Sequence, residues 1–371
     1  MLTNIELFQF KRFKNEYLNL APLTLLTGIN GTGKSSIIQA LLVLRQSFDR
    51  GDLQNHKRIV IEDKELVNLI SPDDMLCSKA ESTKVSISIT ENTGEKATWE
   101  MIAEGSSNTL PVKFISDNED IYSSALFSNS FQFLNAERVG PRVNYNRLSV
   151  SRPHSPIGYR GEFAASRILE ALNKNEKVEL EHISIKGIKP NVYEQLSAWI
   201  SEIIYPGTIV SVDDSDATKI TMQYTFKEEQ TKTFNPMNIG FGFSYALPVI
   251  LAVLTAKVGS ILIVENPEAH LHPKGQAQMG KLLALAAQSG VQVLIESHSD
   301  HLLNGIRLIV KGDSTFGKLD SDKVLIHFFS PEFSPESIAY RTLQINSNGK
   351  LNGWPNGFFD EWESNLRKLL K

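Results

Sequence analysis

Residues 28–35 have the types and spacing of a loop that binds phosphate groups. Gly28, Gly33, Lys34 and Ser35 fit the pattern GxxxxGKS/T, with apolar residues before and after it. Glycines let successive backbone N–H groups turn inward toward phosphate oxygens, and a helix beginning near Lys34 adds the positive end of its dipole. Lys34 would bridge the β- and γ-phosphates of a nucleotide, and Ser35 would coordinate Mg²⁺. The alternative is a chance glycine turn, but the complete pattern in this context favours phosphate binding.

A second set of polar residues follows two apolar runs in the C-terminal half. Residues 261–264 are followed by Glu265, and residues 291–295 by Glu296 and then His298. Apolar runs of this length, with Gln292 as the one polar residue in these two, are typical of central parallel strands, and ligands bind at the carboxyl ends of such strands. An acid there can hold Mg²⁺ directly or through water. We expect His298 to contact a γ-phosphate rather than to serve a structural role.

Composition limits the class of protein. The chain has 371 residues, 41% hydrophobic and 22% charged, which is typical of a globular protein of two or three domains. A net charge of −4 argues against a protein that coats nucleic acid, although a local basic patch stays open. The single cysteine, Cys77, fits a reducing cytosol. The N-terminus lacks a signal peptide, and the uncharged run 237–256 predicts a buried helix rather than a membrane span, so we expect a cytoplasmic protein.

Hydrophobic periodicity predicts the elements that carry these residues. Strands are expected over 3–27, with a slip of phase between Leu7 and Phe8 that suggests a bulge or a doubly covered strand. Residues 85–89 and 98–102 are expected to pair as neighbouring strands. Helices are expected over 163–174 and 191–205, followed by strands within 207–235.

In their order, the motifs resemble those of the ABC-type ATPases, and in particular the OLD-like (overcoming-lysogenization-defect-like) AAA ATPases of bacteria and phages. The residues that carry this resemblance are 28–35, 238–244, 264–273 and 296–302. The middle of the chain matches loosely, through 135–138 and 160–162. The tail, 353–361, is similar to an uncharacterised C-terminal extension found on many such proteins.

The resemblance implies an α/β P-loop NTPase fold of the ABC or SMC-head type. Its mixed sheet would have parallel central strands, with an inserted helical and strand region and a short C-terminal extension. The implied division is an N-terminal lobe with the P-loop at 1–49, an insertion or arm at 50–235, a C-terminal lobe at 236–320 and the extension at 321–371.

The resemblance also implies ATP and Mg²⁺ as ligands and assigns roles to residues. The nucleotide-binding set is Arg12, Asn30, Gly31, Thr32, Gly33, Lys34, Ser35 and Ser36. The signature residues are Gly240, Gly242 and Ser244, which would meet the γ-phosphate bound on a second subunit, with a helix beginning at Ser244. The catalytic set is Glu265, Glu268 and the switch histidine His298, and Mg²⁺ would be held by Ser35 and Glu265.

One position departs from the family pattern. Relatives carry a second acid, the base that orients water, where this chain has Asn266. An amide cannot accept a proton at neutral pH, so ATP hydrolysis is expected to be slow unless Glu268 or Glu296 substitutes. We expect Asn266→Glu to raise hydrolysis, unless one of those acids already fills the role. His270 and His272 are spaced like metal ligands, but the resemblance favours a role in shaping the loop.

The expected function is an ATP-driven switch that acts as a dimer, or a higher homo-oligomer, with two sandwiched nucleotides. It would regulate a separate effector, such as a nuclease or toxin, in bacterial anti-phage defence. The alternatives are an OLD-like nuclease component, a DNA-repair ATPase of the SMC group and a transporter subunit. Against them stand a C-terminal segment of only about 70 residues after His298, the absence of a long coiled-coil pattern, and a signature that departs from LSGGQ. A nucleic-acid role would use Lys11, Arg12, Lys14, Arg138 and Arg142.

Overall fold

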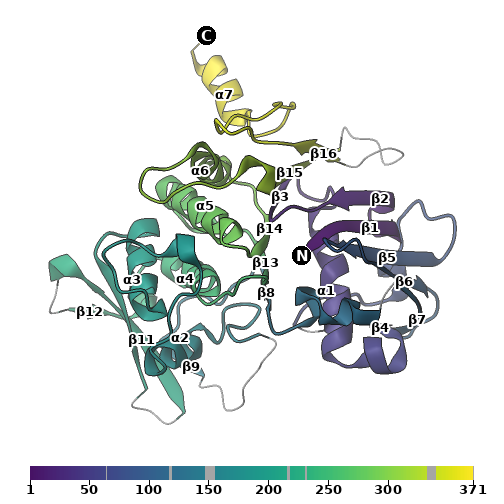
Figure 1. Ribbon diagram of the computed structural model, residues 1–371, viewed down its shortest axis with the longest axis horizontal. Helices are drawn as coiled ribbons and strands as arrows, with labels where there is room; N and C mark the ends of the chain where they lie inside the picture. The colour runs from purple at the N-terminus through teal and green to yellow at the C-terminus, as the bar shows by residue number, and fades with distance from the viewer. Residues whose placement is uncertain are drawn as a thin grey trace. The chain divides into compact units, whose positions relative to one another are not determined.

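A computed structural model of the chain describes residues 1–63, 65–116, 119–146, 155–214, 218–229, 232–331 and 340–370. The chain folds into two compact units (Figure 1). The first unit comprises Met1–Ser128, Val324–Gln344 and Leu351–Lys371, and the second comprises Asn129–Lys323 and Ile345–Lys350. The four-part division that the motifs suggest stays a prediction.

The first unit contains an antiparallel sheet and a smaller mixed group of strands. The antiparallel sheet has the order β2-β1-β5-β6-β7-β4. In the mixed group, β15 pairs in parallel with β3 and antiparallel with β16. The elements are β1 Leu2–Phe10, β2 Phe13–Asn19, β3 Leu23–Gly28, α1 Lys34–Asp49, β4 Arg58–Val60, β5 Lys84–Glu91, β6 Lys96–Ile102, β7 Thr109–Ser116, β15 Val324–Phe329, β16 Tyr340–Leu343 and α7 Glu361–Leu369.

The alternation along β1 breaks at Gln9, not between Leu7 and Phe8. Ile5 and Leu7 are buried and Phe8 is 37% exposed, so the period of two continues through Phe8. Gln9 has a left-handed backbone with φ of 50° and is buried together with the residue that follows it. Its amide donates to the Ser82 hydroxyl at 2.8 Å and to a backbone carbonyl, which satisfies the buried polar group. The predicted irregularity is therefore real but lies two residues later.

The predicted pairing of 85–89 with 98–102 is confirmed in β5 and β6. The two strands are antiparallel, and Ile87 lies opposite Trp99. Trp99 is fully buried and packs against Phe114 and Phe127. Large aromatic rings bury much apolar surface, so this cluster stabilises the sheet.

The second unit contains three parallel strands with helices beside them and a separate antiparallel sheet (Figure 1). The parallel strands have the order β8-β13-β14, and β11 pairs with β9, β10 and β12. The elements are β8 Phe131–Leu134, β9 Asn144–Asn146, α2 Ala164–Asn173, α3 Val192–Ile203, β10 Thr208–Asp213, β11 Lys219–Phe226, β12 Thr233–Phe234, α4 Phe241–Leu254, β13 Ile261–Glu265, α5 Pro273–Gln288, β14 Gln292–Glu296 and α6 Asp300–Lys311.

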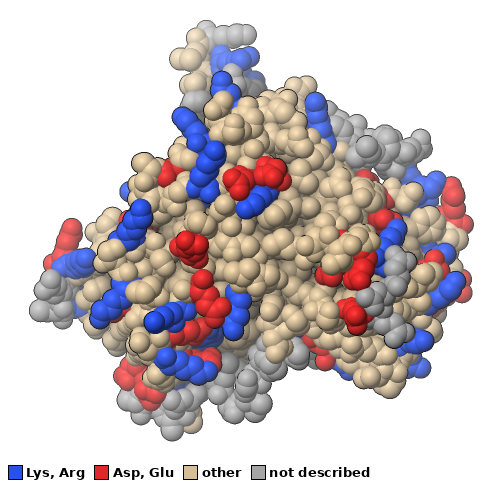
Figure 2. All heavy atoms as spheres, in the orientation of Figure 1, with Lys and Arg blue, Asp and Glu red and all other residues tan. Residues whose placement is uncertain are grey.

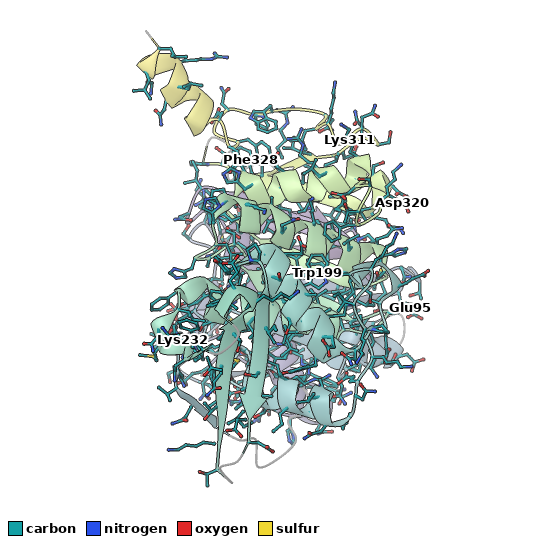
Figure 3. The ribbon with its side chains drawn as sticks, turned by 90° about the vertical axis from the view of Figure 1, so that its left-hand side faces the viewer. Glu95, Trp199, Lys232, Lys311, Asp320 and Phe328 are labelled. Atoms are coloured by element: carbon teal, nitrogen blue, oxygen red, sulfur yellow. The ribbon has the colours of Figure 1, made fainter. Side chains whose placement is uncertain are left out.

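These elements confirm the helices expected over 163–174 and 191–205 and within the uncharged run 237–256. Trp199 of α3, which Figure 3 labels, is completely buried. Its indole N–H donates to the Ile183 carbonyl at 2.8 Å, and its ring stacks on Phe316. Helix α4 is buried along most of its length. Among the described residues, no helix has the length and apolar character needed to cross a membrane.

His327 of β15 is a completely buried histidine whose two ring nitrogens both have partners. One nitrogen lies 2.8 Å from the Asn19 carbonyl oxygen and the other lies 3.0 Å from the Thr342 hydroxyl. Burial lowers the pKa of His327 to about 4, because the charged ring would lose its hydration. The neutral ring therefore holds β15 to its neighbours in the first unit.

We predict that the folded chain loses stability as the pH falls from about 6.5 to about 4. In this window the unfolded chain protonates His327 and the folded chain does not, so protons favour unfolding. The loss contributed by this residue should approach about 3 kcal/mol at pH 4. His327→Gln keeps a donor for the Asn19 carbonyl but cannot titrate, so its urea-unfolding free energy should depend less on pH. Equal pH dependence in both proteins would contradict the assignment.

Candidate nucleotide site

The phosphate-binding pattern folds as predicted, as a strand, a tight turn and a helix. Strand β3 ends at Gly28 and α1 begins at Lys34, with Gly33 as its N-cap in a left-handed conformation. Gly28 has a φ of 128°, and a Cβ there would lie only 2.0 Å from the carbonyl oxygen of Phe329. Only glycine allows the neighbouring backbone of β15 to approach this closely, so this contact determines where the loop leaves the sheet.

Lys34 lies across the loop with its ammonium group on backbone carbonyls. Its Nζ donates to the Gly28 oxygen at 3.0 Å and to the Ile29 oxygen at 2.8 Å. The residue is only 2% exposed. A buried ammonium needs such acceptors, and phosphate oxygens are acceptors of the same kind. Lys34 is thus placed for the contact that the sequence predicts.

The other predicted nucleotide-binding residues are close together in the first unit. The Thr32 hydroxyl donates to the Ile29 carbonyl at 2.6 Å, and an Arg12 N–H donates to the Gly31 carbonyl at 3.2 Å. Asn30, Gly31 and Ser35 are exposed, whereas Thr32 and Ser36 are buried. A Cβ at Gly31 would meet no atom of the described residues within 4 Å, which leaves space beside the loop in this part of the structure. The residues present fit a Mg²⁺–nucleotide, with an exposed hydroxyl and a helix amino end beside open space.

The acids of the second unit lie at the carboxyl ends of parallel strands. In the register of β13 and β14, Glu265 is the partner of Glu296, and β8 pairs on the other side of β13. A Glu265 carboxylate oxygen accepts from the Ala136 N–H at 3.1 Å. Burial raises the pKa of Glu265 to about 7 and the Glu296 charge adds to this, while Ala136 and Arg138 oppose it. The predicted acidic strand end is therefore present and largely desolvated.

Asn266 adopts a left-handed backbone conformation with φ of 45°. Its N–H donates to the Glu296 carbonyl at 2.8 Å, which joins the ends of the two strands. Asparagine tolerates this conformation better than most residues, which gives a physical reason for an amide at this position. Its side-chain Oδ1 is buried and has no hydrogen-bond partner among the described residues.

Glu268 connects the turn after β13 to the loop after β14. One carboxylate oxygen accepts from the His298 N–H at 3.0 Å. The other oxygen is buried and has no hydrogen-bond partner in the described part of the chain. Burial raises the pKa of Glu268, although the His298 and Ser297 hydrogen bonds lower it. The fold thus brings Glu265, Glu268 and the exposed His298 to one edge of the second unit.

The signature helix begins earlier than predicted. Helix α4 starts at Phe241 with Gly240 as its N-cap, so the prediction of a helix from Ser244 is wrong. Ser244 lies one turn into the helix and is 5% exposed. A Cβ at Gly242 would lie 2.8 Å from the His270 carbonyl oxygen, so a larger residue would be too close to this oxygen. The groups at the amino end of α4 are therefore Gly240 and Phe241.

The two histidines after β13 have structural roles. The His270 ring packs edge-on against Tyr245 of α4, and His272 caps α5 by accepting from the Lys274 N–H at 3.3 Å. No group of three His, Cys, Asp or Glu residues is arranged to hold a metal ion within the described ranges. The loop-shaping role that the resemblance implied fits these contacts.

Two residues of the predicted nucleic-acid cluster, Arg138 and Lys14, differ from the prediction of an exposed basic patch. Arg138 is 2% exposed and donates to the backbone carbonyls of Glu265 and Asn266, so it is not a surface residue. Lys14 pairs with Glu81 at 2.7 Å. Basic and acidic side chains are interspersed on the face that Figure 2 shows. Sequence reasoning missed Arg138 as part of the acidic site, although the residue lies just after an apolar run and within 135–138, one of the stretches that resemble the family.

Comparisons with known proteins agree with this fold. The family model described as "AAA domain, putative AbiEii toxin, Type IV TA system" matches residues 104–304, more than half of the chain. A model described as an AAA ATPase domain matches residues 1–151, and one for a protein of unknown function, DUF3696, matches residues 319–369. A search of curated protein sequences found no match.

Two solved structures of SMC heads have the same fold. One, a head bound to the C-winged helix domain of ScpA, matches with a TM-score of 0.56 and 11% identity, covering 92% of this chain and 98% of that one. The other, from Pyrococcus furiosus with an extended coiled coil and the C-terminal domain of ScpA, has a TM-score of 0.54 and 11% identity, covering 100% and 99%. The chain has an α/β P-loop ATPase fold that resembles the SMC head, and it belongs to the AbiEii-type AAA ATPase family.

Proposed function

We propose that this protein is an ATP-driven switch that works as a homodimer with two sandwiched nucleotides and regulates a separate effector protein. The observation that carries the proposal is Lys34, a buried lysine at the first position of α1 whose ammonium rests on two loop carbonyls. An ammonium group in this place can donate hydrogen bonds to phosphate oxygens. The family description names a toxin of a toxin–antitoxin system, and on that basis we place the switch in bacterial defence against phage, with a nuclease or toxin as effector.

The chain's own residues divide the work on bound ATP. Lys34 would hold the phosphates, Ser35 and Glu265 would hold Mg²⁺, and the bound ion would neutralise charge on the transferred group. Glu268 would take the proton of the attacking water, because one of its oxygens is held by the His298 N–H while the other, which is buried, has no hydrogen-bond partner among the described residues. Burial raises the pKa of Glu268, which makes it a stronger base.

We predict that Lys34→Ala abolishes ATP binding, or its coupling to hydrolysis, without unfolding the chain. The substitution removes the ammonium group. With ATP bound, this group would exchange its contacts with the loop carbonyls for contacts with the phosphates. Calorimetric titration with ATP and circular dichroism of the same sample measure both effects. Wild-type affinity together with wild-type activity in the variant would exclude the P-loop assignment.

We predict that Glu268→Gln lowers phosphate release by about 10²–10⁴-fold while ATP stays bound, as expected for loss of a general base. Asn266→Glu should change the rate little, because a glutamate must adopt the left-handed backbone there. Glu296→Gln is the matched control for Glu268→Gln. It removes a buried acid on the neighbouring strand and should retain most turnover. A rate increase in Asn266→Glu with wild-type turnover in Glu268→Gln would move the base to position 266.

We predict that the amino end of α4 contacts the nucleotide of a second copy. Gly240 is the N-cap in an extended conformation, and a Cβ there would meet none of the atoms that the structure describes within 4 Å. Gly240→Asp should therefore fold, since Asp is a good N-cap, but its charge should repel a phosphate. Gly240→Asn is the matched neutral control.

Sedimentation velocity with a slowly hydrolysed ATP analogue tests this contact. Wild type and Gly240→Asn should dimerise, and Gly240→Asp should need about tenfold more protein or not dimerise, while its affinity for the analogue is retained. Equal dimerisation of the two variants would argue against a role for this helix end.

A further inference from the structure

Arg138 is a buried arginine with no role in the function proposed so far. It lies in the loop after β8, the strand that pairs with β13, and is 2% exposed. Lysine and arginine are almost never this buried unless their donors are paired. Its surroundings therefore determine why a guanidinium is placed there.

The guanidinium reaches two consecutive backbone carbonyls at the end of β13. One terminal nitrogen donates to the Asn266 oxygen at 3.0 Å, and the other donates to the Glu265 oxygen in a short hydrogen bond. The rigid planar fork of arginine suits two neighbouring acceptors, whereas a lysine ammonium is a single point of charge. The same loop donates the Ala136 N–H to the Glu265 carboxylate.

The loop that carries Arg138 is itself held in place. The Asn135 N–H donates to the Tyr159 carbonyl and the Val139 N–H donates to the Arg160 carbonyl, both at 2.8 Å. These bonds lie on either side of Arg138. The position of the guanidinium is therefore fixed by the backbone hydrogen bonds of its own loop as well as by its two carbonyl acceptors.

Fold stability alone does not account for a charge at this place. Burial lowers the pKa of Arg138 to about 10, against the nearby Glu268 and Glu265 charges. Replacing a buried charged group by an apolar one of similar size is often neutral or stabilising. The Nε of Arg138 is buried without a hydrogen-bond partner among the described residues, so the packing is not optimised for the charge.

The two carbonyls that accept from Arg138 belong to the turn after β13, and this turn sets the positions of Glu265 and Glu268. Asn266 is in the left-handed conformation, with its N–H bound to Glu296 on one side and its carbonyl bound to Arg138 on the other. After this turn the chain places Glu268 against the His298 N–H. Strain of this kind persists only where the surroundings hold it.

We propose that Arg138 is a positioning residue for ATP hydrolysis: it fixes the left-handed turn at Asn266, and through it the carboxylates of Glu265 and Glu268, without touching the nucleotide. This inference rests on the proposed function for its consequence, but the clamp itself is a property of the chain alone.

Hydrogen exchange of the peptide that covers residues 265–271 tests the clamp without nucleotide. Arg138→Ala should make its amides exchange at least about tenfold faster, corresponding to about 1.4 kcal/mol of lost protection. Arg138→Met should accelerate exchange by the same amount. This second variant controls for misfolding, because an apolar side chain can fill the buried site. Arg160→Ala, a half-exposed arginine beside the loop, should leave exchange unchanged. Unchanged exchange in both Arg138 variants would overturn the proposal.

Steady-state ATP hydrolysis tests the consequence. Arg138→Ala and Arg138→Met should lose kcat by about 10²-fold with little change in KM or ATP affinity, as expected for a residue that orients groups needed in the transition state. Millimolar guanidinium should restore part of kcat in Arg138→Ala but not in Arg138→Met, and Arg138→Lys should stay impaired.

Two outcomes of the kinetic test would also overturn the inference, and a further outcome concerns the proposed function alone. A parallel loss of ATP affinity would make Arg138 a nucleotide ligand, and wild-type kcat in Arg138→Lys would show that the fork is not required. A wild-type protein without hydrolysis, in which Arg138→Ala still accelerates exchange, would count against the ATPase function and not against the clamp.

Discussion

Buried charge at the carboxyl end of β13 is the constraint that shapes the second unit. Two carboxylates, Glu265 and Glu268, lie there with raised pKa values because burial disfavours their charged forms. Backbone N–H groups of Ala136 and His298 and the guanidinium of Arg138 offset that cost. These partners come from the loops after β8 and β14, the two strands that flank β13, so the parallel order β8-β13-β14 is what brings them together.

The first unit satisfies the buried ammonium group of Lys34 in a similar way. The Lys34 ammonium is kept out of water by the loop and donates to two carbonyl oxygens, and phosphate oxygens are acceptors of the same kind. The loop begins at Gly28, which touches the backbone of Phe329, and β15 is held by the uncharged His327. The position of the P-loop therefore depends on a strand nearly 300 residues later in the chain.

Local patterns predicted the elements of the fold that are encoded in consecutive residues. The P-loop, the strand that ends in Glu265 and helix α4 could be found because each is encoded in consecutive residues. The irregularity at Gln9 and the burial of Arg138 could not, because both depend on acceptors far away in sequence. The start of α4 was misplaced because glycines before a helix can belong to the turn or to the first helical turn, and only the tertiary contact of Gly242 distinguishes them.

The most direct test of the central claim is phosphate release from ATP by the wild-type protein as Mg²⁺ is titrated. The fold and the acids described above predict release that saturates with ATP, requires Mg²⁺ and is faster when Glu268 is ionised than when it is protonated at lower pH. Release that is absent, or that proceeds equally without Mg²⁺ and at every pH, would contradict the assignment of this chain as an ATP-hydrolysing switch.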